Sequence, residues 1–458
     1  MLFRISVIAF VFAISVNHGV SAEITQFRGS NGDGIAEGTA APTHFSIEKN
    51  LSWKAAVPGK GWSSPVISDG KLWLTTAIEI FPTEEEREAL LTKAGDDPKV
   101  FKMRGIAKAI TLRLLKIDLA SGEIEDQVDL VHVDEPNPIH KTNSYASPTP
   151  VIAGGSIYCH FGTYGTYCVN RDDLKIKWER KIPLVHGVGP GSSPFVYKNL
   201  LVLICDGVDK QYVTSLNKDN GETVWSMDRP PMDVSDGDLK KSFDTPVAVV
   251  DRLGREQIIC MGAHWIVAYA PEDGKEIWKV QHGKGFSVVP RPVIGNGMVY
   301  LSTGFGKAQL WAIRLDGSGD VTETHVAWTE TRNIPTKPSP LLIGDRIYVM
   351  GDTGIATCFD AIEGTTIWTE RVGGNYSASP LYVNGKIFFA NHEGKVIVIE
   401  HADEYNEVIQ NSIGEQIMAS PIAVDDALFI RTDKHLFRFN SEQSNSKPAA
   451  VSQVESQK

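Results

Sequence analysis

The 458-residue chain lacks the signals that define most enzyme classes. Its five cysteines form no CxxC or CxxCH motif, so thiolate zinc and covalent haem have no support in the sequence. No GxSxG, HExxH, P-loop or dinucleotide fingerprint occurs, and no nucleophile–base pair is evident. The net charge of −11 argues against a nucleic-acid partner, because such proteins need a basic face.

The first residues have the features of an export signal rather than of a fold. Arg4 supplies a positive start, Ile5–Val16 an apolar core too short for a membrane span, and Ala22 ends a small-residue cleavage site. No later stretch is long and apolar enough to span a membrane, and no lipid-attachment cysteine follows the cleavage site. We therefore expect a mature chain that begins at Glu23, is periplasmic or secreted, and is monomeric.

One pattern recurs eight times along the chain. Each copy has a proline-led apolar run, a tight turn and a second apolar run, as in SSPVISDGKLWL at Ser63–Leu74, which is typical of a β-hairpin. After a longer first gap the copies are about 40–52 residues apart, a spacing typical of propellers. The prolines that begin the copies are Pro65, Pro150, Pro194, Pro246, Pro292, Pro340, Pro380 and Pro421.

The repeat predicts an all-β, eight-bladed β-propeller of four-stranded blades over residues 51–440. Five copies end in a strand that carries a tryptophan, whereas the last copy ends at Asn440 without one. Leu51–Val57 is a lone strand with Trp53, and we expect it to complete the last blade and so close the ring. We expect the outer tryptophans to pack blade against blade; they are Trp178, Trp225, Trp278, Trp328 and Trp368.

Three segments depart from the repeat. A helical insertion is expected at about 79–110, with a capping box at Thr83–Glu86 and helical sequence through Lys93. Residues 23–50 are irregular, and we expect Gln26–Gly34 to form surface turns, since it lacks most ligands of a calcium loop. Ser441–Lys458 is polar and without periodicity, which indicates a disordered tail.

Connectivity places the longer, individual loops on one face of the ring. We letter the four strands of each blade A to D, from the proline-led inner strand to the outer strand. The D-to-A loops between blades and the B-to-C loops within them share this loop face, and the short A-to-B and C-to-D turns share the opposite turn face. Other polar groups predicted on the loop face include Trp62, His392, Gln416, Asp433 and Lys434. The predicted ligand-binding residues are His140, Lys141, Asn143, Tyr145, His160, His186, Asp206, Asp209, Lys210, Gln211, Arg291, Lys307, Lys337, Asn375 and Tyr376.

The segment His140–Pro148 is the strongest single prediction for ligand contact, because residues just before strand A lie nearest the central channel. Its cations, amides and aromatics suit a polar or anionic molecule or a peptide. The alternative is that these groups only solvate the mouth of the ring. Asp206 and Asp209 are oxygen ligands of a type that binds calcium, but they form no complete metal site.

Two cysteines pose a separate question. Cys159 and Cys168 flank a loop, and a symmetric hairpin would place them opposite each other. In an oxidising compartment they form a possible disulfide, although direct cross-strand bridges demand specific geometry. The alternative is a pair of buried free thiols.

The closings at Gly221–Trp225 and Gly274–Trp278 resemble the pyrroloquinoline-quinone (PQQ) repeat, and the resemblance covers about Leu51–Asn440. The motifs QFRG at Gln26–Gly29 and HKTNSYASPTP at His140–Pro150 are similar to those of exported PQQ-binding-like propellers of planctomycetes. The repeat is also similar to that of the outer-membrane assembly scaffold BamB, a non-catalytic eight-bladed propeller. Here the lipid-attachment cysteine of that scaffold is missing.

Quinoprotein alcohol dehydrogenases share the repeat and hold PQQ with Ca²⁺ at the propeller axis. The adjacent cysteine pair typical of those enzymes is absent from this chain. The resemblance therefore implies no certain cofactor, and PQQ with Ca²⁺ only if the protein is an enzyme. We predict a non-catalytic binding or scaffold module for a protein partner or a small polar ligand. The alternative is a PQQ-dependent alcohol or sugar dehydrogenase.

Overall fold

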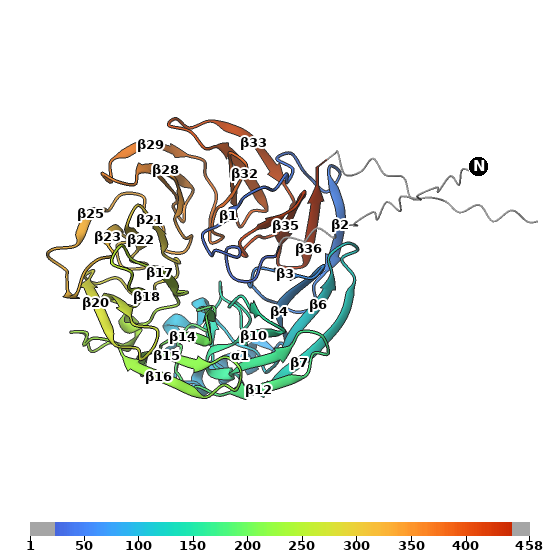
Figure 1. Ribbon diagram of the computed structural model, residues 1–458. Coiled ribbons are helices and arrows are strands. Elements are labelled where there is room, and N and C mark those ends of the chain that lie inside the picture. Colours follow the sequence, from blue (N-terminus) through green and yellow to red (C-terminus); the bar gives the residue numbers. More distant parts are fainter. Residues whose placement is uncertain (1–22, 442–458) are drawn as a thin grey trace, which may run out of the picture.

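The chain forms a ring of eight sheets around a central channel (Figure 1). The computed structural model describes residues 23–441, so the predicted export signal and residues 442–458 of the predicted tail lie outside the described residues. The predicted eight-bladed propeller of four-stranded blades is confirmed. Within residues 23–441, no helix combines the length and apolar character that crossing a membrane requires.

Each blade has four antiparallel strands, from inner strand A to outer strand D, and in blades 1 to 7 these four follow chain order. The strands, from A to D, are as follows: in blade 1, β3 (Val66–Ser68), β4 (Lys71–Ile80), β6 (Ala109–Asp118) and β7 (Ile124–Asp134); in blade 2, β9 (Val151–Ala153), β10 (Ser156–His160), β11 (Thr166–Asn170) and β12 (Ile176–Arg180). In blade 3 they are β13 (Phe195–Tyr197), β14 (Leu200–Asp206), β15 (Gln211–Asn217) and β16 (Thr223–Asp228); in blade 4, β17 (Val247–Val250), β18 (Glu256–Met261), β19 (Trp265–Tyr269) and β20 (Glu276–Gln281).

The second half of the ring repeats this arrangement. In blade 5 the strands are β21 (Val293–Gly295), β22 (Met298–Ser302), β23 (Leu310–Arg314) and β25 (Val326–Glu330); in blade 6, β26 (Leu341–Ile343), β27 (Arg346–Met350), β28 (Ile355–Asp360) and β29 (Thr366–Arg371). In blade 7 they are β30 (Leu381–Val383), β31 (Lys386–Ala390), β32 (Lys395–Glu400) and β33 (Glu407–Ser412); in blade 8, β34 (Ile422–Val424), β35 (Ala427–Arg431), β36 (His435–Asn440) and β2 (Leu51–Ala56).

The N-terminal strand closes the ring, as predicted. Strand β2 pairs antiparallel with β36, with Leu51 opposite Phe439 and Trp53 opposite Arg438. The last blade thus takes its outer strand from the other end of the chain. This pairing leaves no free edge on β36, and an unpaired edge would invite association with another chain.

In most blades that have an outer tryptophan, this side chain packs against a turn of the next blade. The Trp225 indole N–H donates to the Pro271 carbonyl at 2.9 Å in the neighbouring blade. The same turn carries Gly274, where an ideal Cβ would come within 2.6 Å of the Trp225 ring. Similar pairs join Trp53 to Gly122, Trp178 to Gly221 and Trp328 to Gly364. The predicted blade-to-blade packing of the tryptophans is confirmed.

Two interfaces vary this contact. Blade 6 has no glycine partner, and Trp368 instead packs edge-on against Tyr405, with ring centroids 5.5 Å apart. Trp278 donates to Gln257 Oε1 at 2.7 Å, beside the short strand β24 (Gly319–Asp320), which pairs parallel with β20. A larger loop in blade 5 therefore replaces the usual glycine turn.

A chain of hydroxyl groups surrounds the channel at the residues just before the anchor prolines. Seven of these eight positions are Ser or Thr. Most of their hydroxyl groups accept a hydrogen bond from the backbone N–H of the equivalent residue in the preceding blade; Ser64 N, for example, donates to Thr149 Oγ1 at 2.9 Å. Equivalent bonds reach Ser193, Thr245, Ser339, Ser379 and Ser420. The eighth position is Arg291, whose side chain turns toward the N-terminal segment.

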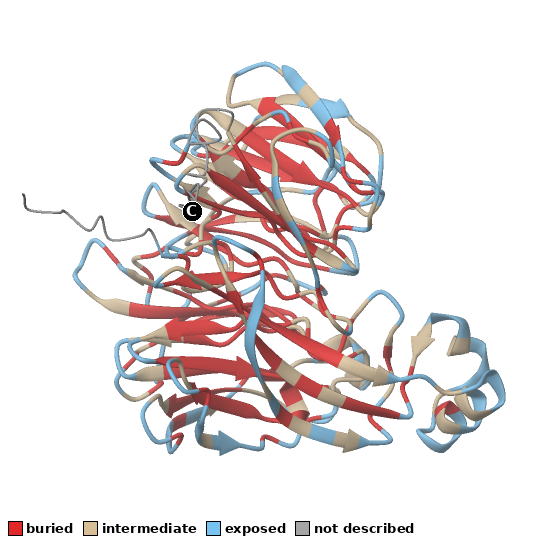
Figure 2. Cartoon of the chain, turned by 90° about the vertical axis from the view of Figure 1, so that its right-hand side faces the viewer, coloured by how far each residue is buried: buried red, intermediate tan, exposed pale blue. Residues whose placement is uncertain are grey.

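The insertion projects from blade 1 as a largely exposed arm (Figure 2). It contains α1 (Glu84–Lys93), with the predicted capping box present at Thr83 and Glu86, and the 3₁₀ helix η1 (Pro98–Met103). The arm returns through β5 (Arg104–Gly105), which pairs with β8 (Ile139–His140) ahead of blade 2. Two further 3₁₀ turns are η2 (Gly162–Tyr164) and η3 (Gly237–Lys240).

Residues 24–36, which we call the channel plug, cross the channel between distant blades. Ile24 pairs with Ile67 in blade 1, and the Thr25 carbonyl accepts from Ile152 N at 2.7 Å in blade 2. The plug ends in β1 (Ile35–Ala36), which pairs parallel with β30 of blade 7. Gln26–Gly34 forms turns, as expected, and Ser30 and Asn31 are exposed. The expected surface position is wrong for Arg28, Gly32 and Gly34, which are buried where the plug crosses the channel.

The possible disulfide between Cys159 and Cys168 is also corrected. The register places Cys159 opposite Tyr167 and Cys168 opposite Tyr158, so the two cysteines are one step apart and face opposite sides of the sheet. Cys159 packs in the core between blades 1 and 2, and Cys168 packs toward blade 3. Both are buried free thiols, which is the alternative that the sequence left open.

Replacing Gly274 by alanine tests the docking contact. Both Gly274 (φ +74°) and Gly297 (φ +70°) have left-handed backbone, but a Cβ at residue 297 meets no atom within 4 Å. We expect Gly297→Ala to cost about 1 kcal/mol from backbone strain alone. Gly274→Ala should cost about 1–3 kcal/mol more, because the added methyl group overpacks against Trp225. Urea unfolding of both variants measures the difference, and equal losses would contradict a docking role for this glycine.

Candidate functional site

A cavity of about 510 Å³ opens on the loop face beside the channel. It brings together loops from blades 1, 2, 7 and 8, where the two ends of the ring meet. D-to-A and B-to-C loops both line it, which confirms that they share one face. The lining residues are Lys60, Trp62, Lys141, Thr142, His392, Gln416, Met418, Asp433 and Lys434.

Backbone contacts hold the lining loops in place. Lys60 pairs with Ala77 through two backbone hydrogen bonds of 2.8 and 2.9 Å, and Trp62 N donates to the Ala146 carbonyl at 3.1 Å. The Trp62 indole donates to the Thr142 carbonyl at 3.1 Å, which ties the first lining loop to the second. The cavity wall thus consists of loops that are tied to strands and to one another, and a rigid wall favours specific binding.

The far wall is organised by Thr432. Its hydroxyl donates to Glu415 Oε2 at 2.6 Å and accepts from the backbone N–H of Lys434 and His435. Glu415 also binds Lys54 at 2.9 Å, so its charge is already compensated. The Lys434 carbonyl accepts from Val57 N at 2.9 Å, which links this wall to the strand that closes the ring.

The cavity is positively charged although the chain as a whole is acidic. Three lysines and one aspartate line it, in a protein of net charge −11. Over residues 23–441, none of Lys60, Lys141 and Lys434 forms an ion pair with an acidic side chain. The Lys60 ammonium group lies 5.4 Å from the centre of the Trp62 ring, a cation–π distance. This arrangement suits a ligand with negative charge and a flat or apolar part.

The positive potential extends across the channel mouth. Burial lowers the pKa of His140 below its usual value, and the charges of Arg104, Lys141, Lys337 and Lys241 lower it further. Lys241 and Lys337 belong to blades 4 and 6, so cations from several blades influence one histidine. A neutral His140 at pH 7 follows, with its Nδ1 bonded to Thr142 Oγ1 at 2.8 Å.

The structure places five of the predicted ligand-binding residues in the interior instead of at the surface: Tyr145, His160, Asp206, Arg291 and Tyr376. The Tyr145 hydroxyl donates to the Asn137 carbonyl at 3.0 Å, and His160 bonds Thr166 Oγ1 at 2.8 Å. Loop position in the sequence does not reveal this burial, because the neighbouring blades that cover these side chains are distant along the chain.

Asp206 belongs to a buried ion pair. Its carboxylate contacts Arg229 at 2.9 Å, and the Arg229 guanidinium also donates to the Cys260 and Met261 carbonyls at 3.0 Å. Burial raises the pKa of Asp206, and the neighbouring guanidinium opposes that shift. Both oxygens are engaged by Arg229, so Asp206 is not available as the calcium ligand that the sequence suggested.

The other predicted residues lie at or near the loop-face surface. Asn143 donates to the Val188 and Pro190 carbonyls, Asp209 accepts from Val185 N, and Gln211 donates to the Gly207 carbonyl. Asn375 binds Glu393. These contacts support loops, and the side chains that remain most available to a ligand are Lys141, Lys210 and Lys307, which are exposed.

The donor groups at these positions do not fit a calcium-bound quinone. Residues 23–441 contain no group of three or more His, Cys, Asp or Glu side chains that could hold a metal ion. Of the two predicted calcium ligands, Asp206 is bound to Arg229, and Asp209 is exposed and supports the Val185 loop. We therefore assign no PQQ or calcium site to the loop face.

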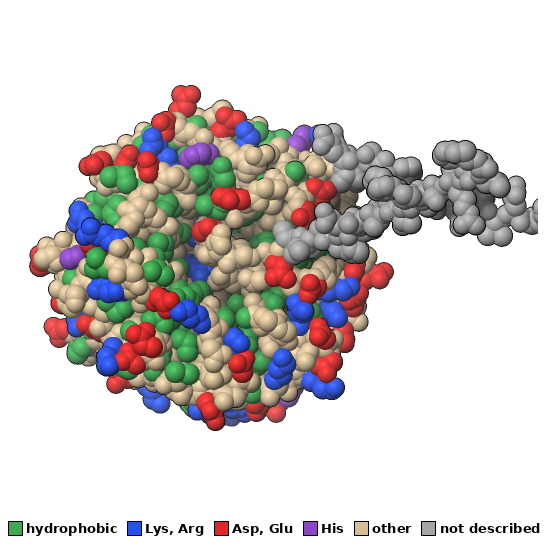
Figure 3. All heavy atoms as spheres, viewed as in Figure 1, with side chains coloured by type: hydrophobic (Ala, Val, Ile, Leu, Met, Phe, Trp, Pro, Cys, Tyr) green, Lys and Arg blue, Asp and Glu red, His purple; other side chains and the backbone are tan. Residues whose placement is uncertain are grey.

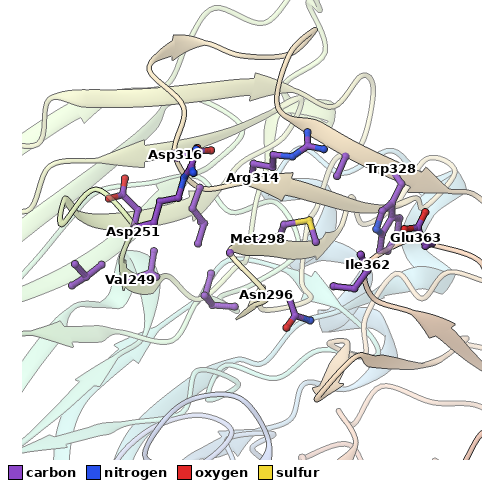
Figure 4. Close-up of a pocket in the computed structure, with 15 residues that line it drawn as sticks. Val249, Asp251, Asn296, Met298, Arg314, Asp316, Trp328, Ile362 and Glu363 are labelled. Carbon is purple, nitrogen blue, oxygen red and sulfur yellow. The ribbon is translucent and has the colours of Figure 1, made fainter.

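Lys60 was not among the residues that sequence analysis selected. It lies between Gly59 and Gly61 in the loop that joins β2 to β3, and the connectivity that selected Trp62 also applies to it. A larger hollow of about 790 Å³ lies on the turn face between blades 4, 5 and 6 (Figure 4). Its Trp328 donates to the Ala361 carbonyl at 3.0 Å, so that side chain already docks two blades.

Eight four-stranded blades, with tryptophan–glycine contacts at four of the interfaces, define a β-propeller of the PQQ-repeat class. A family profile described as outer membrane protein assembly factor BamB matches residues 209–447, which is more than half of the chain. The chain belongs to this family. A comparison with curated protein sequences found no match.

Solved structures show the same architecture. BamB from Moraxella catarrhalis is similar to this chain, with a TM-score of 0.51 and 12% identity over 73% of this chain and 93% of that one. A europium-containing methanol dehydrogenase is also similar, with a TM-score of 0.62 and 11% identity over 91% of this chain and 98% of that one. At these identities, both likenesses show a shared fold.

Removing the Asp206 carboxylate should destabilise the protein strongly. Asp206→Ala leaves the buried Arg229 charge uncompensated, which we expect to lower the free energy of unfolding by about 3–5 kcal/mol. The matched variant Asp209→Ala removes an exposed carboxylate and should change it by about 1 kcal/mol or less. Urea unfolding distinguishes the two, and a small loss in Asp206→Ala would contradict the structural role of the pair.

Acid should weaken the fold through the buried His160 and the partly buried His186. Burial lowers the pKa of His160 to about 3 and that of His186 to about 4, below the value of about 6.5 in an unfolded chain. From pH 6.5 downward the unfolded state binds more protons, so stability falls as pH falls toward these values. Each histidine contributes a slope of up to about 1.4 kcal/mol per pH unit. Urea midpoints of wild type and His160→Gln between pH 7 and pH 4.5 measure it; parallel slopes would refute the assignment.

Proposed function

We propose that this protein is an exported, non-catalytic binding scaffold whose ligand site is the loop-face cavity. The ligand is a negatively charged group, carried by a partner protein or by a small polar molecule. The observation that carries this proposal is the set of three lysines around Trp62 in a cavity whose only lining acid, among the described residues, is Asp433.

Charge and architecture both support this function. An anion entering the cavity gains the attraction of Lys60, Lys141 and Lys434, which no acidic side chain in residues 23–441 neutralises by an ion pair. The acidic remainder of the surface repels the same ligand, so binding concentrates at this one mouth. The family profile described as assembly factor BamB supports a partner-binding role, whereas the fold alone does not distinguish binding from catalysis, because a methanol dehydrogenase shares it.

The test is a binding titration with a fluorescein-labelled hexaglutamate peptide, followed by anisotropy. We expect saturable binding to the protein at low salt and weaker binding at high salt, because surface charge interactions are screened. Lys141→Glu with Lys434→Glu should weaken binding at least about tenfold. The control Lys102→Glu with Lys181→Glu makes the same charge change at two exposed lysines outside the cavity and should bind as wild type. Equal affinity in both double variants, or no binding to wild type, would refute the proposal.

The same titration with PQQ separates the two classes of function. Calcium-independent binding that is lost in Lys141→Glu with Lys434→Glu fits an anion-binding cavity. Binding that requires Ca²⁺ and survives those substitutions would instead support a quinoprotein dehydrogenase, and would justify a screen of alcohols and sugars with an artificial electron acceptor.

A further inference from the structure

The channel plug carries a buried cation that forms no ion pair or hydrogen bond within residues 23–441. Arg28 is 3% exposed, and its Nε, Nη1 and Nη2 atoms have no hydrogen-bond partner among residues 23–441. A guanidinium group has five N–H donors, and a buried charge normally has an ion-pair or hydrogen-bond partner. Arg28 therefore stands out among the buried groups of this chain.

The backbone is arranged to hold Arg28 in this position. Arg28 has a φ of +67°, a left-handed conformation that is costly for a residue other than glycine. Gly34 leaves room for the side chain, because an ideal Cβ there would lie 2.6 Å from Arg28 Nη2 and 3.0 Å from the Pro380 carbonyl oxygen. The plug thus accepts backbone strain and directs the guanidinium toward blade 7.

A second buried arginine adds to the positive charge. Arg291 is 1% exposed and donates to the Phe27 carbonyl at 2.6 Å, Gln26 Oε1 at 2.9 Å and the Pro246 carbonyl at 3.0 Å. These acceptors are neutral. Burial lowers the pKa of Arg28 to about 9; Asp33 opposes this shift, and the positive charge of Arg291 adds to it.

The nearby acids do not balance this charge. Asp33 interacts with both arginines through space, but its Oδ1 accepts from Ile35 N at 2.9 Å, and it forms no ion pair with either within residues 23–441. Asp244 is fully buried, and burial raises its own pKa well above the usual value. Burial lowers the pKa of Arg291 and Asp244 opposes that shift, but Asp244 forms no ion pair with either arginine within residues 23–441. Figure 3 shows a hollow at the centre of the ring with Lys or Arg atoms inside it.

We propose that a small oxyanion, a free carboxylate or a phosphate-like ion, binds at the Arg28 guanidinium beneath the channel plug. The flat fork of donors matches two oxygens of such an ion, and the bound charge compensates the two arginines. This site is at the plug and uses none of the residues of the loop-face cavity, so it is independent of the function proposed above.

A crystal of the mature protein soaked in selenate tests the site directly. We expect an anomalous selenium peak within hydrogen-bond distance of the Arg28 guanidinium. Ordered water alone at Arg28, or peaks confined to surface lysines as an adventitious ion only, would overturn the proposal. This measurement needs no variant and so does not depend on whether a substituted protein folds.

Thermal unfolding in phosphate or acetate, at constant ionic strength, tests binding in solution. We expect a saturable rise of the unfolding midpoint in wild type and in the control Arg180→Met, which removes an exposed arginine. Arg28→Lys should raise the half-saturating anion concentration about tenfold, and Arg28→Met should abolish the rise of the unfolding midpoint. The same response in Arg28→Met as in wild type would refute the site, and Arg28→Lys decides if Arg28→Met does not fold. Loss of the response in Lys141→Glu with Lys434→Glu would place the ion at the loop face instead.

Discussion

The ring depends on the contact between an outer tryptophan and the turn of the next blade. Trp225 shows its two parts: the indole N–H donates to the Pro271 carbonyl, and the ring covers Gly274, where no side chain fits. A single four-stranded blade exposes two apolar faces and cannot bury them alone, so stability comes from neighbours. Repeating one contact around the circle fixes the angle between blades, and where the repeat lacks glycine, Tyr405 packs against Trp368 in its place.

Closure of this ring creates the candidate ligand site. Because β2 completes the last blade, the loop that follows it carries Lys60 and Trp62 to the same mouth as Asp433 and Lys434, which are more than 370 residues later in the sequence. The cavity therefore exists only in the closed propeller. Its charge has the opposite sign to that of the whole chain, and this contrast gives an acidic scaffold one place where an anion is favoured.

The interior shows two ways of placing charge in a propeller. Between blades 3 and 4, Asp206 and Arg229 compensate each other, and the pair is complete without a ligand. In the channel, Arg28 and Arg291 have neutral acceptors or none, and the plug that carries Arg28 is strained at that residue. The first arrangement serves stability, whereas the second leaves positive charge for a group that the protein itself does not supply.

The sequence alone was sufficient to predict the architecture, because the contacts between blades repeat along the chain. The eight anchor prolines indicate the number of blades, and the recurring tryptophans indicate the outer strand of a blade. The lone strand at Trp53 indicates how the ring closes. The sequence also separated loop face from turn face, since connectivity decides that. Burial within a loop was different. Tyr145 and Arg291 occupy loop positions like that of Lys141, and Asp206 ends strand β14, yet neighbouring blades cover all three. The path of Gln26–Gly34 through the channel likewise followed from no local signal. Only the tertiary structure decided these points, because they depend on contacts between residues far apart in the chain.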